Sequence, residues 1–327
     1  MVDRFGREIN YMRISVTDRC NLRCLYCMPE EGIDYKLTHK DILSLEELAR
    51  LTRVAASVGI KKVRLTGGEP LVRKNIEKLV EYIAEIPEID DIALTTNGVK
   101  FKVMATRLKK AGLKRVNFSL DSLKPERFSY ITRGGDIKPV MEGIFTALEL
   151  GLNPIKINTV VIKGFNDDEV LEFAKLAYDY PLHIRFIEFM PVGDIKFWNE
   201  DKLIKSEKIK SRIEHEFELA LPDKIVGSGP AKYFKLRGGQ GSVGFISPMS
   251  NHFCGECNRI RLTADGKLRG CLYSKEEVDL MEAIKQNAND DELAEIFLEA
   301  INNKPRHHNF GSGWGKENER KMYQIGG

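Results

Sequence analysis

The chain of 327 residues alternates short β-rich segments with helical segments six times. Strands joined through helices by short connections run parallel, with right-handed crossovers, so this alternation favours an α/β fold on a parallel sheet. Six units predict a partial (β/α)6 barrel of the TIM type, since the complete barrel has eight. The predicted strands are Tyr11–Thr17, Lys62–Thr66, Asp91–Thr95, Arg115–Leu120, Lys156–Ile162 and His183–Glu188.

Capping residues mark the helices between these strands. Ser44-Leu45-Glu46-Glu47 has the S-x-x-E pattern of a capping box and begins a helix that reaches about Val58. Gly112 and Gly151 suit the position just after a helix, where a left-handed conformation is common. The other helices are predicted near Ile76–Ile83, Val103–Ala111, Val140–Leu150 and Asp167–Tyr178.

After about Pro191 the pattern changes to hairpins rich in glycine. We therefore expect a barrel domain over residues 1–190 and a smaller C-terminal α+β domain over 191–327. Gly239-Gln240-Gly241-Ser242-Val243-Gly244 matches G-x-G-x-x-G, but the dinucleotide-binding motif requires a helix after it. The segment that follows, Phe245-Ile246-Ser247-Pro248, is extended and contains proline, so we predict a hairpin turn.

All six cysteines belong to two groups, with the spacings C-x3-C-x2-C and C-x2-C-x13-C. Each group offers three thiolates, one fewer than a four-iron cluster needs, so one iron stays open to a non-protein ligand. The sequence therefore predicts two [4Fe–4S] clusters with open coordination sites. The first group is Cys20, Cys24 and Cys27, and the second is Cys254, Cys257 and Cys271.

Disulfides and zinc are the alternatives for these thiols. A chain of this length with 42% hydrophobic residues can bury a core without disulfides. The charged first residues, which no apolar stretch follows, lead us to expect a reducing cytoplasm, where disulfides are rare. Zinc remains open for the second group, because His252 can complete a Cys3His site.

Basic and polar residues recur on one face of the predicted strands. The net charge of +3 is too small for a general nucleic-acid or membrane surface, so an anion site requires a local concentration of basic residues. Because side chains alternate between the two sides of a strand, the basic and polar residues of each strand lie on the same side, which predicts a polar, positively charged barrel interior. The alternative is that these side chains lie at the ends of strands and reach solvent. The sets are Arg13, Ser15 and Thr17; Arg64 and Thr66; Ser119; Lys156 and Asn158; Arg185; and Arg259 and Arg261.

Two motifs one strand apart carry a family resemblance. The C-x3-C-x2-C loop, with Tyr26 before its third cysteine, follows the first strand, and Thr66-Gly67-Gly68-Glu69-Pro70 follows the second. Together they resemble the radical S-adenosylmethionine superfamily. Arg185–Pro191, Asn258–Leu262 and the terminal Gly326-Gly327 further resemble the GTP 3′,8-cyclase (MoaA) family, and this likeness covers nearly the whole chain.

The resemblance implies a role for each candidate residue. The first cysteine group would hold a cluster that binds S-adenosyl-L-methionine, and the second a cluster that binds the guanine of GTP. Arg259 and Arg261 would serve catalysis as well as binding, and the Gly-Gly tail would reach the active site. The cofactor contacts would be Tyr26, Gly68, Ser119 and Met190, with Glu69 a further one, and the GTP contacts Arg13, Arg64, Thr95, Lys156, Arg259 and Arg261.

The implied reaction converts GTP to (8S)-3′,8-cyclo-7,8-dihydroguanosine 5′-triphosphate by 3′-hydrogen abstraction and C3′–C8 bond formation, the first step of molybdenum-cofactor biosynthesis. The implied partners are an external one-electron reductant, a downstream cyclic pyranopterin monophosphate synthase and a second copy in a homodimer, with no nucleic acid and no membrane. A peptide-modifying enzyme of the same superfamily and a non-enzymatic iron–sulfur carrier are the alternatives.

Overall fold

The computed structural model describes residues 1–33, 37–38, 40–192, 197–222, 229–308 and 320–326. A parallel sheet forms its centre, with six strands in sequence order. All six predicted strands are present, with ends that differ by two residues at most. They are β1 (Tyr11–Ser15), β2 (Lys62–Thr66), β3 (Asp91–Thr96), β4 (Arg115–Ser119), β5 (Ile155–Val161) and β6 (Leu182–Glu188).

The C-terminal third extends this sheet at both edges. β10 (Arg259–Leu262) pairs parallel with β1, and β9 (Ser242–Ile246) pairs parallel with β6. Antiparallel partners then complete a twelve-stranded order, β12-β11-β10-β1-β2-β3-β4-β5-β6-β9-β8-β7. The outer strands are β7 (Leu219–Ala220), β8 (Lys232–Leu236), β11 (Lys267–Arg269) and β12 (Val278–Asp279).

These pairings confirm the partial barrel and the hairpin. Gly239 and Gly241 lie in the turn that joins β8 to β9, so the G-x-G-x-x-G match has no helix after it. Because β9 and β10 belong to the barrel sheet, the second part of the chain helps to enclose the interior. The domain boundary at residue 190 stays a prediction.

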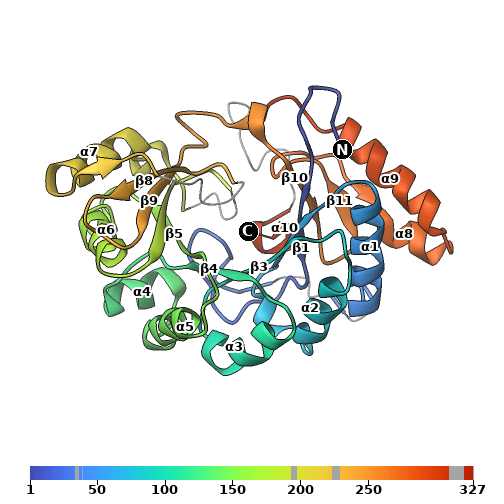
Figure 1. The fold of residues 1–327 in the computed structure, drawn as a ribbon, viewed down its shortest axis with the longest axis horizontal. Helices are drawn as coiled ribbons and strands as arrows, with labels where there is room; N and C mark the ends of the chain where they lie inside the picture. Colours follow the sequence, from blue (N-terminus) through green and yellow to red (C-terminus); the bar gives the residue numbers. More distant parts are fainter. Residues whose placement is uncertain (34–36, 39, 193–196, 223–228, 309–319, 327) are drawn as a thin grey trace.

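Helices cover the outside of the sheet, and α10 (Met322–Ile325) lies near the middle of the barrel (Figure 1). The predicted capping box at Ser44 and Glu47 is present at the start of α1. The outer helices are α1 (Leu45–Ser57), α2 (Ile76–Ala84), α3 (Phe101–Lys110), α4 (Pro125–Thr132), α5 (Lys138–Glu149), α6 (Val170–Asp179), α7 (Ser206–Glu216), α8 (Leu280–Lys285) and α9 (Asp290–Asn302).

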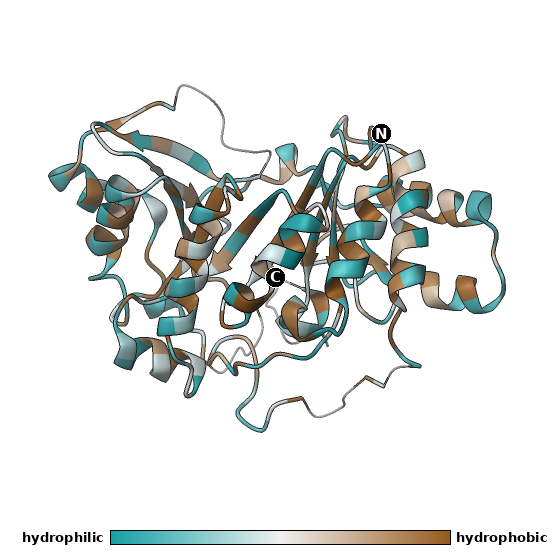
Figure 2. Cartoon of the chain, turned by 60° about the horizontal axis from the view of Figure 1, so that its bottom comes forward, coloured by the Kyte–Doolittle hydropathy of each residue, from teal (hydrophilic) through white to brown (hydrophobic). Residues whose placement is uncertain are grey.

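The hydrophobic core fills the layer between the sheet and these helices. Phe101 and Phe118 pack edge to face at 5.0 Å between ring centroids, and Phe173 packs similarly against Phe186 at 6.4 Å. The helices carry hydrophobic and hydrophilic bands, as expected when one face is buried (Figure 2). In the described ranges, no helix combines the length and apolar character that crossing a membrane requires.

Candidate functional site

A cavity of about 330 Å³ occupies the barrel interior, and all six cysteines line it. The sequence places the two groups more than two hundred residues apart, but β10 beside β1 brings them to the same space. The remaining predicted contacts also line the cavity, with the exception of Lys156. They are Tyr26, Gly68, Ser119, Met190, Arg13, Arg64, Thr95, Arg259 and Arg261.

The first cysteine group lies in the loop after β1. A tight turn, in which the Cys27 and Met28 amides donate to the Cys24 carbonyl, fixes the spacing of the second and third thiols. The Leu22 amide and the Asn97 side chain donate to Cys20 Sγ at 3.4 and 3.7 Å. All six cysteines are free thiols, and burial raises the pKa of Cys20 to about 11 and that of Cys27 to about 12.

The glycines after β2 hold this loop against the sheet. A Cβ on Gly67 would lie 2.5 Å from the Thr17 carbonyl oxygen, and one on Gly68 would lie 2.5 Å from that of Arg19. The Gly68 and Glu69 amides donate to those same two carbonyls at 2.8 Å. Loop packing therefore requires glycine at both positions.

Glu69 is a buried carboxylate beside the first group. It accepts hydrogen bonds from the Asn97 amide at 2.7 Å, the Thr96 hydroxyl at 2.8 Å and the Leu71 amide at 3.0 Å. Burial outweighs these donors and raises the pKa of Glu69 to about 7. These hydrogen bonds fix the side chain in place, and a nearby cation would favour its ionised form.

Tyr26 is held by a residue that the sequence argument missed. Its hydroxyl donates to Asp121 Oδ2 at 2.6 Å, and Asp121 Oδ1 accepts from the Val160 amide at 2.9 Å. The Tyr26 ring also packs edge-on against Phe189, one residue before Met190. Burial raises the pKa of Asp121 to about 6. This contact ties the first cysteine loop to the ends of β4 and β5.

The second cysteine group faces the cavity from η3 (Cys254–Glu256) and from the segment after β11. Burial alone would raise the pKa of Cys257, but the charges of Arg259 and Lys304 outweigh it and lower this pKa to about 6. The effect is reciprocal: burial lowers the pKa of Arg259, but the Cys257 thiolate outweighs burial and raises this pKa. The positive charge of Arg259 is therefore compensated by the second cysteine group.

His252, the candidate fourth ligand of a zinc site at the second cysteine group, does not line the cavity that the cysteines line. Within the described ranges, no three His, Cys, Asp or Glu side chains converge on one ion position. His252 borders a separate cavity of about 180 Å³ and packs edge-on against His308 at 4.4 Å.

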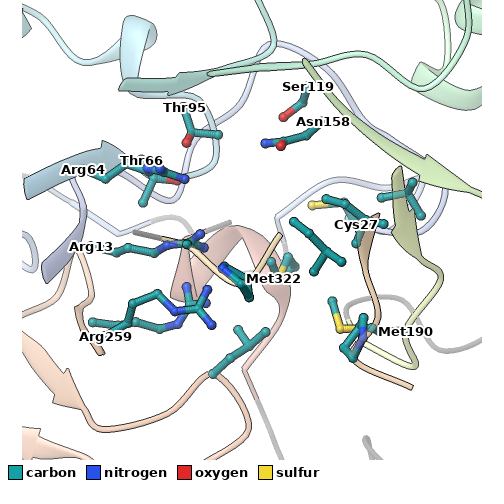
Figure 3. A pocket seen from close by; sticks show the side chains of 18 of the residues that line it. Arg13, Cys27, Arg64, Thr66, Thr95, Ser119, Asn158, Met190, Arg259 and Met322 are labelled. Carbon is teal, nitrogen blue, oxygen red and sulfur yellow. The ribbon is translucent and has the colours of Figure 1, made fainter. Parts of the chain in front are cut away.

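Three arginines form a row across neighbouring strands. The parallel register pairs Arg13 with Arg261 of β10 on one side and with Arg64 of β2 on the other. Burial, together with repulsion from nearby arginines, lowers their pKa values, to about 9 for Arg261 and about 10 for Arg64. Figure 3 shows Arg13, Arg64 and Arg259 on one side of the cavity, opposite Cys27 and Met190.

Several buried polar atoms at this wall lack a hydrogen-bond partner among the described residues. They are the Nε atoms of Arg13, Arg64 and Arg185, Thr95 Oγ1 and Asn158 Oδ1. Buried polar atoms in native proteins are almost always paired. A polyanionic ligand would satisfy the three guanidinium donors, so the residues present fit a bound phosphate chain.

Lys156 lies behind the cavity wall. Its side chain is 3% exposed, and its Nζ sits 5.6 Å from the Tyr233 ring centroid. Burial, followed by repulsion from Arg185 and Arg115, lowers the pKa of Lys156 to about 6. Its contact with substrate stays a prediction, as do the roles of the lining residues.

The C-terminal tail enters the barrel, and Met322 and Tyr323 line the cavity. The Gly326 carbonyl accepts a hydrogen bond from Arg261 Nη1 at 2.6 Å. A Cβ on Gly326, whose φ is +86°, would lie 2.9 Å from Thr66 Cγ2 and 3.1 Å from Ser15 Cβ. The expected approach of the tail thus holds for Gly326, while Gly327 lies outside the described residues.

Comparisons with known proteins agree with this architecture. Residues 14–177 match the model of the Radical SAM superfamily, and residues 182–310 match Molybdenum Cofactor Synthesis C. The structure of Streptococcus suis SuiB bound to S-adenosylmethionine superposes with a TM-score of 0.61 at 13% identity, covering 97% of this chain and 77% of that one. At that identity the likeness shows the fold alone.

Relatives named GTP 3′,8-cyclase match over the full length. The protein from Syntrophomonas wolfei is 63% identical over 327 residues, and that from Moorella thermoacetica is 54% identical, with all of both chains covered in each case. Together with the two family models, these matches show that the chain belongs to the GTP 3′,8-cyclase family of radical S-adenosylmethionine enzymes.

Proposed function

We propose that this chain converts GTP to (8S)-3′,8-cyclo-7,8-dihydroguanosine 5′-triphosphate, the first step of molybdenum-cofactor biosynthesis. One observation carries the proposal: both cysteine groups and the row of arginines open on the same cavity. A radical generated at one cluster and a nucleotide held at the other need such a shared, enclosed space. The names of the full-length relatives support the same reaction.

The two groups of cysteines would hold one [4Fe–4S] cluster each. When bound, the first cluster and S-adenosyl-L-methionine supply a one-electron route to a carbon radical that removes the 3′ hydrogen of GTP. Tyr26, fixed by Asp121, would orient the cofactor at the first group, with Gly68, Ser119 and Met190 around it. The second cluster would hold guanine through its open iron, beside Arg259.

The arginine row would hold the triphosphate. Arg13, Arg64 and Arg261 are buried, and burial together with the charges of other arginines around the cavity lowers the pKa of each. A triphosphate supplies the missing negative charge, and guanidinium groups bind phosphate oxygens well. Fixing the phosphates in this way positions the ribose, and orientation of a reactant accelerates a reaction without contact to the bonds that change.

Further partners are part of the proposal. Radical formation needs an external one-electron reductant, and the product needs a cyclic pyranopterin monophosphate synthase. A homodimer follows the family resemblance. The cytoplasm is the proposed compartment because GTP is found there and because all six cysteines are free thiols.

Anaerobic reconstitution with iron and sulfide, followed by incubation with S-adenosyl-L-methionine, a reductant and GTP, tests the proposal. We expect the cyclised nucleotide by mass spectrometry, and none from a Cys24→Ser control. Cleaved cofactor beside intact GTP would point to a peptide-modifying enzyme of the superfamily instead. Absence of cofactor cleavage by the cluster-loaded protein would favour the iron–sulfur carrier.

A further inference from the structure

Lys304 is a buried lysine directly beside the second cysteine group. Its residue exposure is 2%, and it follows α9 closely. Its ammonium group lies 3.5 Å from Cys257 Sγ, 2.9 Å from the Arg259 carbonyl oxygen and 2.6 Å from the Gly270 carbonyl oxygen. A lysine has three N–H donors, so these three contacts use all of them.

The two carbonyls belong to the segments that carry the cysteines. The Arg259 carbonyl lies two residues after Cys257, and the Gly270 carbonyl directly precedes Cys271. Lys304 therefore links both segments and also reaches a sulfur. Within the described residues, no carboxylate forms an ion pair with it, so the thiolates are its nearest source of negative charge.

A second buried cation supports the same region without contacting a sulfur. Arg7 Nη1 donates to the Cys254 carbonyl at 3.0 Å, and Arg7 Nη2 donates to the Pro305 carbonyl at 2.9 Å. Arg7 is paired with the Asp3 carboxylate at 2.6 Å. Its charge is thus largely neutralised nearby, whereas that of Lys304 is directed at the thiolates.

We propose that Lys304 is a positioning residue for the second cluster, which holds the segments of Cys257 and Cys271 together and raises the reduction potential of that cluster. This inference rests on the proposed function in one respect, namely that the second group holds a cluster. Reduction adds negative charge, which a buried ammonium and a hydrogen bond to a ligand sulfur stabilise. The hydrogen bonds that Lys304 donates in the described chain go to Cys257, Arg259 and Gly270, so we expect its main effect on the second cluster.

The test measures the midpoint potential of the second cluster by anaerobic redox titration followed by electron paramagnetic resonance. A background with Cys20, Cys24 and Cys27 replaced by serine leaves a single cluster to observe in the full-length chain. Lys304→Met removes both charge and donors, and Lys304→Gln removes the charge but keeps N–H donors. Asp3→Asn/Arg7→Met is the control, because it removes a buried ion pair that holds the Cys254 carbonyl and the backbone carbonyls of Lys304 and Pro305 without touching sulfur.

We expect K304M to change the ratio of oxidised to reduced cluster at least tenfold at a fixed potential, which is a shift of about 59 mV to more negative values for one electron. K304Q should shift the potential in the same direction, and the double control should shift it much less. An unchanged potential in K304M, or an equal shift in the control, would overturn the inference. Loss of the second cluster from both Lys304 variants would overturn the assigned effect on the potential and leave only the positioning of the two cysteine segments.

These outcomes differ from a failure of the proposed function. If the serine background with Lys304 intact binds no iron and sulfide at the second group, the two-cluster assignment itself fails. If it binds a normal cluster and the Lys304 variants behave as the background does, only the inference about Lys304 fails.

Discussion

Replacing Arg64 by methionine is expected to stabilise the ligand-free protein while weakening GTP binding. Arg64 is 5% exposed, and its Nε has no hydrogen-bond partner in the described part of the chain. Burial, together with the like charges of Arg185 and Arg115, lowers its pKa from 12.5 to about 10. Neutral pH lies below both the folded and the unfolded pKa, so the folded protein carries the full cost of this charge, about 3 kcal/mol.

Two effects set the net result. Methionine forfeits the cation–π contact with Tyr11, whose ring centroid is 5.3 Å away, and such a buried contact contributes about 1–2 kcal/mol. A net gain of about 1–2 kcal/mol remains, which raises the melting temperature by roughly 1.5–3 °C in a chain of this size. Loss of a charged hydrogen bond to phosphate costs about 1.5–3 kcal/mol, or roughly 10–100-fold in GTP affinity.

Anaerobic thermal unfolding of the reconstituted protein without nucleotide checks the first effect, and equilibrium GTP binding checks the second. Lys61→Met is the matched control, because Lys61 is exposed just before β2 and its loss should change neither quantity. A lower melting temperature for R64M would refute the assignment of stored repulsion to this wall. Unchanged GTP affinity would refute its role in binding.

Three other predictions concern the same cavity. Arg261→Ala should abolish most cyclisation while iron and sulfide content stays that of two clusters, and normal product formation would contradict phosphate binding by this residue. Arg320→Met removes the ion pair with Asp265 at 2.8 Å, so amide exchange across residues 322–326 should accelerate at least tenfold in mass spectrometry; unchanged exchange would show that the tail is held elsewhere. The pKa of Lys156 is lowered to about 6, so this residue is neutral at pH 7.5. The negative charge of a nearby triphosphate should raise this pKa, so that Lys156 gains a proton on binding. GTP binding should therefore take up a proton at pH 7.5 and strengthen as the pH falls toward 6; calorimetry in buffers of different ionisation enthalpy should detect the uptake, and Lys156→Met should lose it.

Local sequence patterns were sufficient for the barrel strands and for α1. Strand β2 was predicted with both ends correct, because its apolar residues end at a glycine pair. The pairing of β9 with β6 and of β10 with β1 was not predicted. Each is a short strand whose partner lies far away in the sequence, and a periodic pattern states that a strand exists but not where it pairs.

The candidate site shows the same division. Strand alternation put Arg13 and Arg64 each on the side of its strand predicted to face the barrel interior, and the register shows that they lie side by side. Lys304 escaped notice because Asn302-Asn303-Lys304-Pro305 has the composition of an exposed helix end, and only the tertiary structure buries it. Asp121 likewise has no local signal, since its function depends on Tyr26 from a distant loop.

The charges around the cavity explain why the protein can contain a row of buried arginines. Arg259 and Lys304 face cysteines whose thiolates compensate them, so their charge belongs to the second cluster. The row of Arg13, Arg64 and Arg261 is compensated less: Cys271 and Cys257 offset only part of the lowered pKa of Arg261, which also donates to the Gly326 carbonyl, and Tyr11 offsets only part of that of Arg13 and Arg64. The folded protein without ligand contains this repulsion, and a bound triphosphate removes it. The free energy of triphosphate binding therefore includes the relief of the repulsion. The same residues therefore reduce the stability of the free protein and strengthen the binding of substrate, which is the trade-off expected of functional residues in a buried site.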